Sequence, residues 1–217
     1  TDKSAAHDAL KTITVDGYAN GSRIGDGTND TTALNNLTLK NAQGTASMTV
    51  DKAAATLDLT VEKLGAAAVL NAKTGAVTTA QVEAVVMLSA APTTLNVKST
   101  GNNYIDFKAA ATETLNVSGT GTLKLDEATA NDLGGLKSIK VTETAGLTLN
   151  HNAGTTNAIT SVDTTGTTGT TTITILGDKA TYAGGAGVGF GFLGGIVGGF
   201  LAGYVILLLE KVFSKIP

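Results

Sequence analysis

The chain contains no cysteine and no tryptophan, and only two prolines among its 217 residues. Without cysteine it can form no disulfide, no zinc–thiolate site and no cysteine nucleophile. Aromatic residues make up only 4% of the sequence, so a hydrophobic core has to be built from Val, Leu, Ile and Ala. The net charge of −3 argues against nucleic-acid binding, because nucleic-acid-binding domains usually carry a basic patch.

Motifs for catalysis are also missing. The sequence has no Gly-x-Ser-x-Gly nucleophile elbow and no phosphate-binding loop with Gly-Lys-Ser/Thr. His7 and His151 lie far apart in polar segments without metal-ligand spacing, and both are expected at the surface. Asp126 and Glu127 are neighbours, but nothing in the sequence places two carboxylates across a cleft, as a glycosidase requires. We therefore expect that the protein is not an enzyme.

Residues 10–176 show a loose internal repeat of short apolar strands. Each repeat has one dominant apolar position, and the intervals between successive positions are similar, with one exception. These positions are Ile13, Leu37, Leu57, Leu95, Leu115, Ile139 and Val162. Because the interval from Leu57 to Leu95 is close to twice the length of the others, one degenerate unit is predicted between these two leucines.

A second short strand follows most of these positions after a polar turn. Apolar and polar residues alternate in it, as in residues 123–125 (Leu-Lys-Leu) and 173–175 (Ile-Thr-Ile), which is typical of a half-buried strand. A unit of about 20–24 residues with two strands buries little alone and has to stack on its neighbours. The sequence therefore predicts a mainly β fold of parallel β-solenoid type. A β-sandwich is the alternative, because short strands at regular spacing are typical of it too.

One segment departs from the β pattern. Residues 78–81 (Thr-Thr-Ala-Gln) resemble a helix capping box, and Val82, Val85 and Val86 follow at helical spacing. These features predict a short helix near residues 79–90 that ends before Pro92. Its expected role is to plug or bridge the β core.

The carboxy-terminal segment is hydrophobic and rich in glycine. Residues 180–209 carry no charge, and a helix needs about 20 apolar residues to cross a bilayer. Five glycines at four-residue intervals would form a smooth stripe for helix packing: Gly187, Gly191, Gly195, Gly199 and Gly203. We expect a β-rich repeat domain over 1–182 and a membrane-type glycine-zipper helix over 183–217, with membrane contact through 189–209. The alternative is a buried glycine-rich element in a soluble assembly.

One loop has the composition of a calcium site. Residues 25–30 read Gly-Asp-Gly-Thr-Asn-Asp, and the oxygens of Asp26, Asn29 and Asp30 are suitable calcium ligands in a glycine-bent loop. The loop lacks the distal Glu and the full spacing of an EF-hand. A plain turn between two strands is therefore the alternative interpretation.

Part of the sequence is similar to a known class of surface proteins. Residues 112–119 (Thr-Glu-Thr-Leu-Asn-Val-Ser-Gly), 136–141 (Leu-Lys-Ser-Ile-Lys-Val) and 159–163 (Ile-Thr-Ser-Val-Asp) resemble the β-rich regions of Gram-negative surface-layer and RTX-type proteins exported by type I secretion. The resemblance extends over residues 1–188 and implies a secreted, self-assembling protein aided by calcium. In that family a Gly-Gly-x-Gly-x-Asp turn binds calcium through its Asp, whereas here Gly189 replaces the Asp.

The tail resembles a different family. Residues 191–205 (Gly-Phe-Leu-Gly-Gly-Ile-Val-Gly-Gly-Phe-Leu-Ala-Gly-Tyr-Val), continuing to Lys211, are similar to a transmembrane stretch of the fructose-specific membrane component of the bacterial phosphotransferase system. Such a transporter needs many spans, a phosphorylatable Cys domain and a His-bearing partner domain. The tail therefore cannot transport sugar by itself. The two resemblances together predict a composite chain with a junction near Val188–Phe190.

These observations predict a structural component of a bacterial cell surface, of surface-layer or adhesin type. It would be extracellular, would have other copies of itself as partners, and would bind no nucleic acid. The alternative is a fragment of a sugar phosphotransferase-system transporter component in the inner membrane, which predicts further spans. A third interpretation is a carbohydrate- or host-binding module, which needs exposed aromatic residues. Outside the tail the chain offers only Tyr18, Tyr104, Phe107 and Tyr182.

Overall fold

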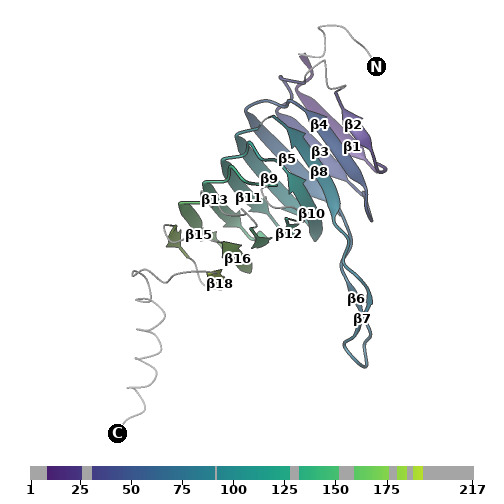
Figure 1. The fold of residues 1–217 in the computed structure, drawn as a ribbon, viewed down its shortest axis with the longest axis vertical. Coiled ribbons are helices and arrows are strands. Elements are labelled where there is room, and N and C mark those ends of the chain that lie inside the picture. Colours follow the sequence, from purple (N-terminus) through teal and green to yellow (C-terminus); the bar gives the residue numbers. More distant parts are fainter. Residues whose placement is uncertain are drawn as a thin grey trace.

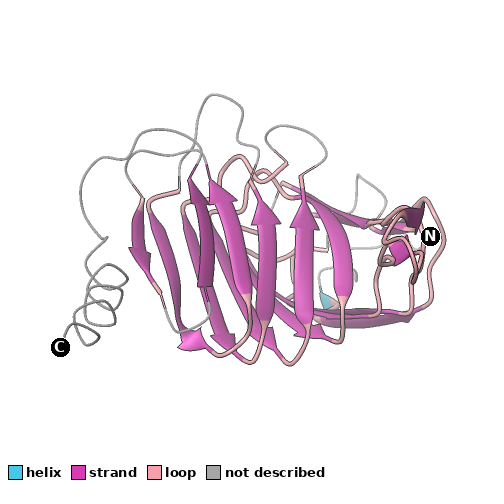
Figure 2. Cartoon of the chain, turned by 90° about the horizontal axis from the view of Figure 1, so that it is seen from below, coloured by secondary structure: helices cyan, strands magenta, loops and turns pink. Residues whose placement is uncertain are grey.

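The computed structural model describes residues 9–25, 31–90, 92–127, 132–151, 159–175, 180–184 and 188–192, the last range through its backbone only. Two sheets of eight strands each lie one against the other and give the described chain an elongated, layered shape (Figure 1). Strands dominate the described residues, and polar turns connect one sheet to the other (Figure 2).

We call the two sheets A and B. Sheet A consists, in spatial order, of β1 (Thr12–Asp16), β3 (Asn36–Lys40), β5 (Thr56–Glu62), β9 (Thr94–Thr100), β11 (Thr114–Gly119), β13 (Ser138–Glu143), β15 (Ser161–Thr167) and β17 (Thr181–Ala183). Sheet B consists of β2 (Ser22–Ile24), β4 (Ser47–Asp51), β8 (Ala84–Ser89), β10 (Asn103–Lys108), β12 (Thr122–Asp126), β14 (Gly146–Asn150), β16 (Thr171–Ile175) and β18 (Val188–Phe192). Because the chain passes alternately through A and B, each pair of successive strands forms one coil.

All neighbouring strands within sheets A and B are parallel. This confirms the predicted parallel β-solenoid. It excludes the β-sandwich, whose sheets are antiparallel. Each strand inside a sheet exchanges backbone hydrogen bonds with the coils on either side, and each edge strand with one, so that the coils depend on one another for their stability.

The register of sheet A confirms most of the predicted repeat positions. Leu95 lies opposite Leu57 on one side and opposite Leu115 on the other. Leu115 in turn lies opposite Ile139. One position was predicted wrongly, because Leu37 lies opposite Leu59 and not Leu57. A shift of two residues keeps the side chain on the same face of a strand, so both leucines still point inward.

The predicted degenerate unit between Leu57 and Leu95 does not exist. β5 pairs directly with β9 along its whole length, so the two strands belong to successive coils. The additional residues form a separate antiparallel hairpin of β6 (Val69–Leu70) and β7 (Val77–Thr79), which projects from the solenoid (Figure 1). An insertion within one coil therefore lengthened the interval between Leu57 and Leu95 by about as much as an additional unit would have done.

Aliphatic side chains fill the space between the two sheets. In β11, Leu115 and Val117 are buried, while Thr114 and Asn116 between them are partly exposed. Phe107 is the only aromatic residue among the buried hydrophobic residues of the described part, as the composition predicted. Burial of one Leu or Val side chain contributes about 1.5–3 kcal/mol, so every coil adds several such contributions to a continuous hydrophobic interior.

The short helix predicted near residues 79–90 is wrong. β7 ends at Thr79, and β8 spans Ala84–Ser89 in the centre of sheet B. The valines fit helical spacing, but Ala84, Val86 and Leu88 are buried with a period of two. β4 and β10 offer β8 a strand on each side, and this tertiary pairing outweighs the local helix signal.

The predicted carboxy-terminal helix is wrong where the structure describes that region. Val188–Phe192 form β18, which pairs with β16 at the edge of sheet B. Residues 193–217 lie outside the described residues, so the rest of the predicted helix, the boundary at residue 183 and the junction near Val188–Phe190 stay predictions. Within the described ranges, no helix has the length and apolarity that a membrane crossing requires.

Candidate functional site

The predicted calcium ligands Asp26, Asn29 and Asp30 lie outside the described residues, so calcium binding there stays a prediction. The chain enters and leaves this loop beside Asp51. A Cβ added to Gly25, which has a φ of +92°, would touch the Asp51 side chain, and the Thr31 hydroxyl donates to the Asp51 carbonyl oxygen at 2.6 Å. Among the described residues, no group of three acidic, His or Cys side chains could hold a metal.

The predicted helix-packing glycines are not brought together in the described residues. Gly191 belongs to β18 and lies opposite Thr174 of β16, so at this position the chain forms a strand and not a helix. Gly187, Gly195, Gly199 and Gly203 lie outside the described residues. The packing stripe therefore has no support from the described part of the chain.

His151 was predicted at the surface, and this prediction is wrong. Its side chain is completely buried, and its Nδ1 lies 2.5 Å from Oε1 of the equally buried Glu127. The two residues directly follow β14 and β12, so they lie in the same corner of adjacent coils. The pair is inaccessible from solvent, and we assign it to the stability of this corner. His7 lies outside the described residues.

The outer face of sheet A is polar and hydrogen-bonded between coils. The Asn116 amide donates to Oδ1 of Asn96, and the Asn96 amide donates to Oδ1 of Asp58. Further along the same row, Lys140 forms an ion pair with Asp163. Hydrogen bonds from the hydroxyl and backbone N–H of Thr165 lower the pKa of Asp163. This face is therefore polar, and its side-chain contacts link adjacent coils.

The outer face of sheet B carries a cluster of carboxylates around β10. Lys108 lies 3.2 Å from both Asp106 and Asp132, so one ammonium group serves two carboxylates. Burial raises the pKa of Asp106, although the Lys108 ammonium opposes this shift. Ile105 lies opposite Leu125, so the next residues, Asp106 and Asp126, are neighbours on adjacent strands.

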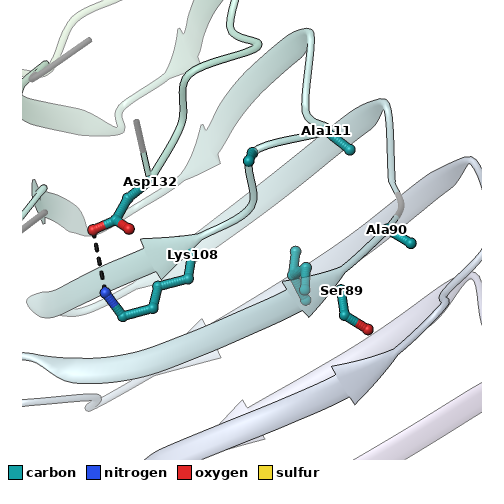
Figure 3. A pocket seen from close by; sticks show the side chains of 7 residues that line it. Ser89, Ala90, Lys108, Ala111 and Asp132 are labelled. Carbon is teal, nitrogen blue, oxygen red and sulfur yellow. Dashed lines mark hydrogen bonds and ion pairs between the residues drawn. The ribbon is translucent and has the colours of Figure 1, made fainter. Parts of the chain in front are cut away.

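A shallow pocket lies at one end of this face, where β8 and β10 end (Figure 3). Its volume is about 350 Å³, and its lining combines small apolar side chains with Lys108 and Asp132. The other lining residues are Leu88, Ser89, Ala90, Ala110 and Ala111. The pocket is open to solvent, and the hydroxyl of Ser89 in its lining donates to Oδ1 of Asp51 at 3.3 Å.

The hairpin is the most prominent feature outside the solenoid. We define the arm as residues 66–82, which contain β6 and β7. At its base Ala66 and Val82 exchange two backbone hydrogen bonds of 2.7 and 2.9 Å. Gly65, just before the base, has a φ of +68° and lies so close to the backbone oxygens of Tyr104 and Val82 that a Cβ would clash. The arm is therefore fixed to β10 at its root.

The turn of the arm is equally well defined. Oδ1 of Asn71 accepts hydrogen bonds from the backbone N–H groups of Lys73 and Thr74 at 2.9 and 3.1 Å, which is an Asx-turn. Gly75 has a φ of +68° and donates its N–H to the Asn71 carbonyl oxygen. The sequence signal Asn-Ala-Lys-Thr-Gly is typical of such a turn, but its position inside the long repeat interval concealed it.

The arm exposes apolar side chains that the solenoid does not cover. Val69, Leu70 and Val77 are 54%, 56% and 61% exposed. In the described part of the chain only two further large hydrophobic residues are exposed, Leu10 and Met87, and Met87 lies on the outer face of sheet B. A two-stranded ribbon is marginally stable alone in water, so an ordered arm with exposed valines and leucine is typical of a contact element.

No protein-family model matches the chain, and no curated protein and no solved structure shows significant similarity to it.

Proposed function

We propose that the chain is a structural component of a bacterial cell surface, of surface-layer or adhesin type, that assembles with copies of itself. The observation that carries the proposal is the uninterrupted parallel stack, in which β5, β9, β11 and β13 pair in sequence around one aliphatic interior. Such a body transmits force along its axis through backbone hydrogen bonds and buried side chains.

The distribution of polar groups supports the same proposal. Ion pairs and amide ladders on the outer faces link one coil to the next, and the pocket beside Lys108 is open to solvent. Exposed apolar residues concentrate on the arm, where a partner can reach them without disturbing the solenoid. A mechanical role uses these features, whereas a catalytic role would need groups that converge on a cavity.

The experiment is electron microscopy of the purified full chain over a range of concentrations, with and without millimolar calcium. Sheets or filaments are the expected result, and their dependence on calcium would test the ligands predicted at Asp26, Asn29 and Asp30. In the producing cells, the protein should be released from the surface by a chelator or by low pH. Dispersed particles at every concentration, together with recovery only in detergent extracts of the inner membrane, would contradict the proposal.

A further inference from the structure

We infer that the copies assemble head to tail, with the arm of one copy docked on the outer face of sheet B of the next copy. This inference rests on the proposed self-assembly and specifies its contact. It names a second copy of this chain as the occupant, because the arm and the outer face of sheet B have complementary apolar and charged groups.

The apolar groups of the two surfaces match. The arm presents Val69, Leu70 and Val77. The receiving face presents Met87, which is 39% exposed, beside the half-buried Val85 on β8. Ala110 and Ala111 add small side chains at the nearby pocket (Figure 3). Four of the five exposed large hydrophobic residues in the described ranges therefore lie on these two surfaces, and docking would cover them together.

The charges match as well. Lys73, at the turn, is the only ionisable residue within the arm. Around β8, β10 and β12, the receiving face has four carboxylates against the two ammonium groups of Lys108 and Lys124. These carboxylates belong to Glu83, Asp106, Asp126 and Asp132. Asp126 forms no ion pair with another described residue, so its carboxylate is free to receive Lys73 of the next copy.

The positions of the two surfaces favour a repeating contact. The arm leaves the solenoid beside Tyr104, where β10 begins, and Lys108 at the pocket is the last residue of β10. Arm and pocket therefore lie at opposite ends of the same strand, so they are two different surfaces of one chain. Contacts between two different surfaces of one chain are heterologous and extend into open filaments when the rotation does not close.

The first test reverses the charge at each side of the contact. Lys73→Glu and Asp126→Lys are each expected to weaken association by about tenfold or more in sedimentation velocity. The double variant K73E/D126K should restore association to within about threefold of the original chain, because the pair is then inverted. Lys98→Glu on the exposed face of sheet A is the matched control and should leave association unchanged. Failure of the double variant to recover would contradict the Lys73–Asp126 pairing.

The second test mixes two complementary variants. One has a disabled arm (K73E, L70S and V77S) and the other a disabled face (D126K and M87S). Each alone should remain monomeric, and an equimolar mixture should form dimers but no longer assemblies, because only one functional contact per pair is left. If the variant with the disabled face assembles by itself, arms bind arms or another surface, and the inference is wrong.

The third test removes the arm, so its result does not depend on which side chains are substituted. Val69 lies opposite Thr79, so residues 69–79 can be replaced by Asn-Gly, which closes a two-residue hairpin turn. The thermal midpoint of this arm-less variant should equal that of the full chain, and its assembly should be lost. If the original chain assembles and the arm-less variant assembles equally well, only the docking inference falls. If the original chain never assembles, the proposed function itself falls.

Discussion

At the scale of single residues, Glu127 and His151 form a buried polar pair at one corner of the stack. Their side chains are 1% and 0% exposed, and the backbone N–H of His151 donates to the Thr174 carbonyl oxygen at 2.9 Å. Nε2 of His151 has no hydrogen-bond partner among the described residues. The pair therefore stabilises the corner only as long as both members are present.

We expect Glu127→Ala to lower the free energy of unfolding by about 3–5 kcal/mol, because it leaves His151 buried without its partner. The double variant E127L/H151L should be less destabilised than E127A, since apolar residues of similar size suit this interior. Urea denaturation measures both. Glu113→Ala removes an exposed ion pair with Lys137 and should change stability by less than about 1 kcal/mol. Equal effects of E127A and E113A would contradict the structural role.

The position of this pair could have been predicted from the sequence. The separation of Glu127 from His151 along the chain equals that of Leu123 from Leu147, which lie opposite each other in the paired strands β12 and β14. Polar residues at a repeat interval can therefore lie side by side in adjacent coils, as these leucines do. The prediction failed because each residue was interpreted from its polar neighbours and not from its place in the coil.

Tyr18 provides a second prediction at this scale. Its hydroxyl is buried without a hydrogen-bond partner in the described residues, and burial raises the pKa of the phenol from 10.0 to about 12. The unfolded chain therefore loses this proton first. The stability that the neutral phenol contributes is complete below pH 10.0 and is lost as the pH rises towards about 12.

Ultraviolet absorption of tyrosinate in the original chain and in Tyr18→Phe isolates this group. The component that is missing from Tyr18→Phe should titrate at about pH 12. The same substitution should not destabilise the protein at neutral pH, because it removes a hydroxyl that has no partner in the described residues. A missing component with a midpoint at pH 10.0 would show that the phenol is solvated.

At the scale of elements, glycine fixes the distance between successive coils at their corners. Gly119 ends β11 with a φ of +105°, and a Cβ at this position would clash with the Ser99 carbonyl oxygen of the coil next to it. On the other side, its N–H donates to Oε2 of Glu143 at 2.9 Å. The residue is therefore held between two coils, and its conformation and its lack of a side chain are both required.

We expect Gly119→Ala to destabilise the chain by more than the strain of a positive φ alone, which is about 1–2 kcal/mol. Gly17→Ala is the matched control, because Gly17 has a φ of +72° and no atom within 4 Å of an added Cβ. The difference between the two variants in urea denaturation measures the clash between coils. Equal losses of stability would mean that the coils separate without strain.

The elements could be predicted where local pattern and coil pairing agree. In Thr94–Thr100 and Thr114–Gly119 the alternation of Leu and Val with polar residues predicted strands with the observed faces. In Ala84–Ser89 the pattern of apolar residues fits both helical and strand spacing. Pairing with β4 and β10 selects the strand. Short apolar segments of this kind are ambiguous until their neighbours in space are known.

At the scale of the whole molecule, the sequence repeat predicted the solenoid but did not predict the arm. Apolar positions about 20–24 residues apart require stacking, since one coil cannot bury its own side chains. An interval of nearly twice that length fits two coils or one coil with an insertion, and the apolar positions alone cannot separate these cases. The direct pairing of Leu57 with Leu95 shows that the interval is one coil with an insertion. The inserted residues form the arm, which is the proposed contact surface.

The stack also predicts how stability varies along the molecule. In a quasi-one-dimensional array each coil is stabilised by its own interior and by the coils on either side. β9 pairs with β5 and β11, and its Leu95 is completely buried. β1 pairs on one side with β3, and none of its five residues is completely buried. Local opening of β1 should therefore require less free energy than opening of β9.

Hydrogen exchange of the full chain, followed by mass spectrometry at neutral pH, measures this difference. Backbone amides of β9 and β11 should exchange at least about 100-fold more slowly than those of β1, and β3 should be intermediate. Leu115→Ala, which leaves a cavity in the central coils, should accelerate exchange in β9, β11 and β13 before it affects β1. Uniform protection along sheet A would instead show that the coils open only as one cooperative unit, which would contradict the predicted gradient of stability.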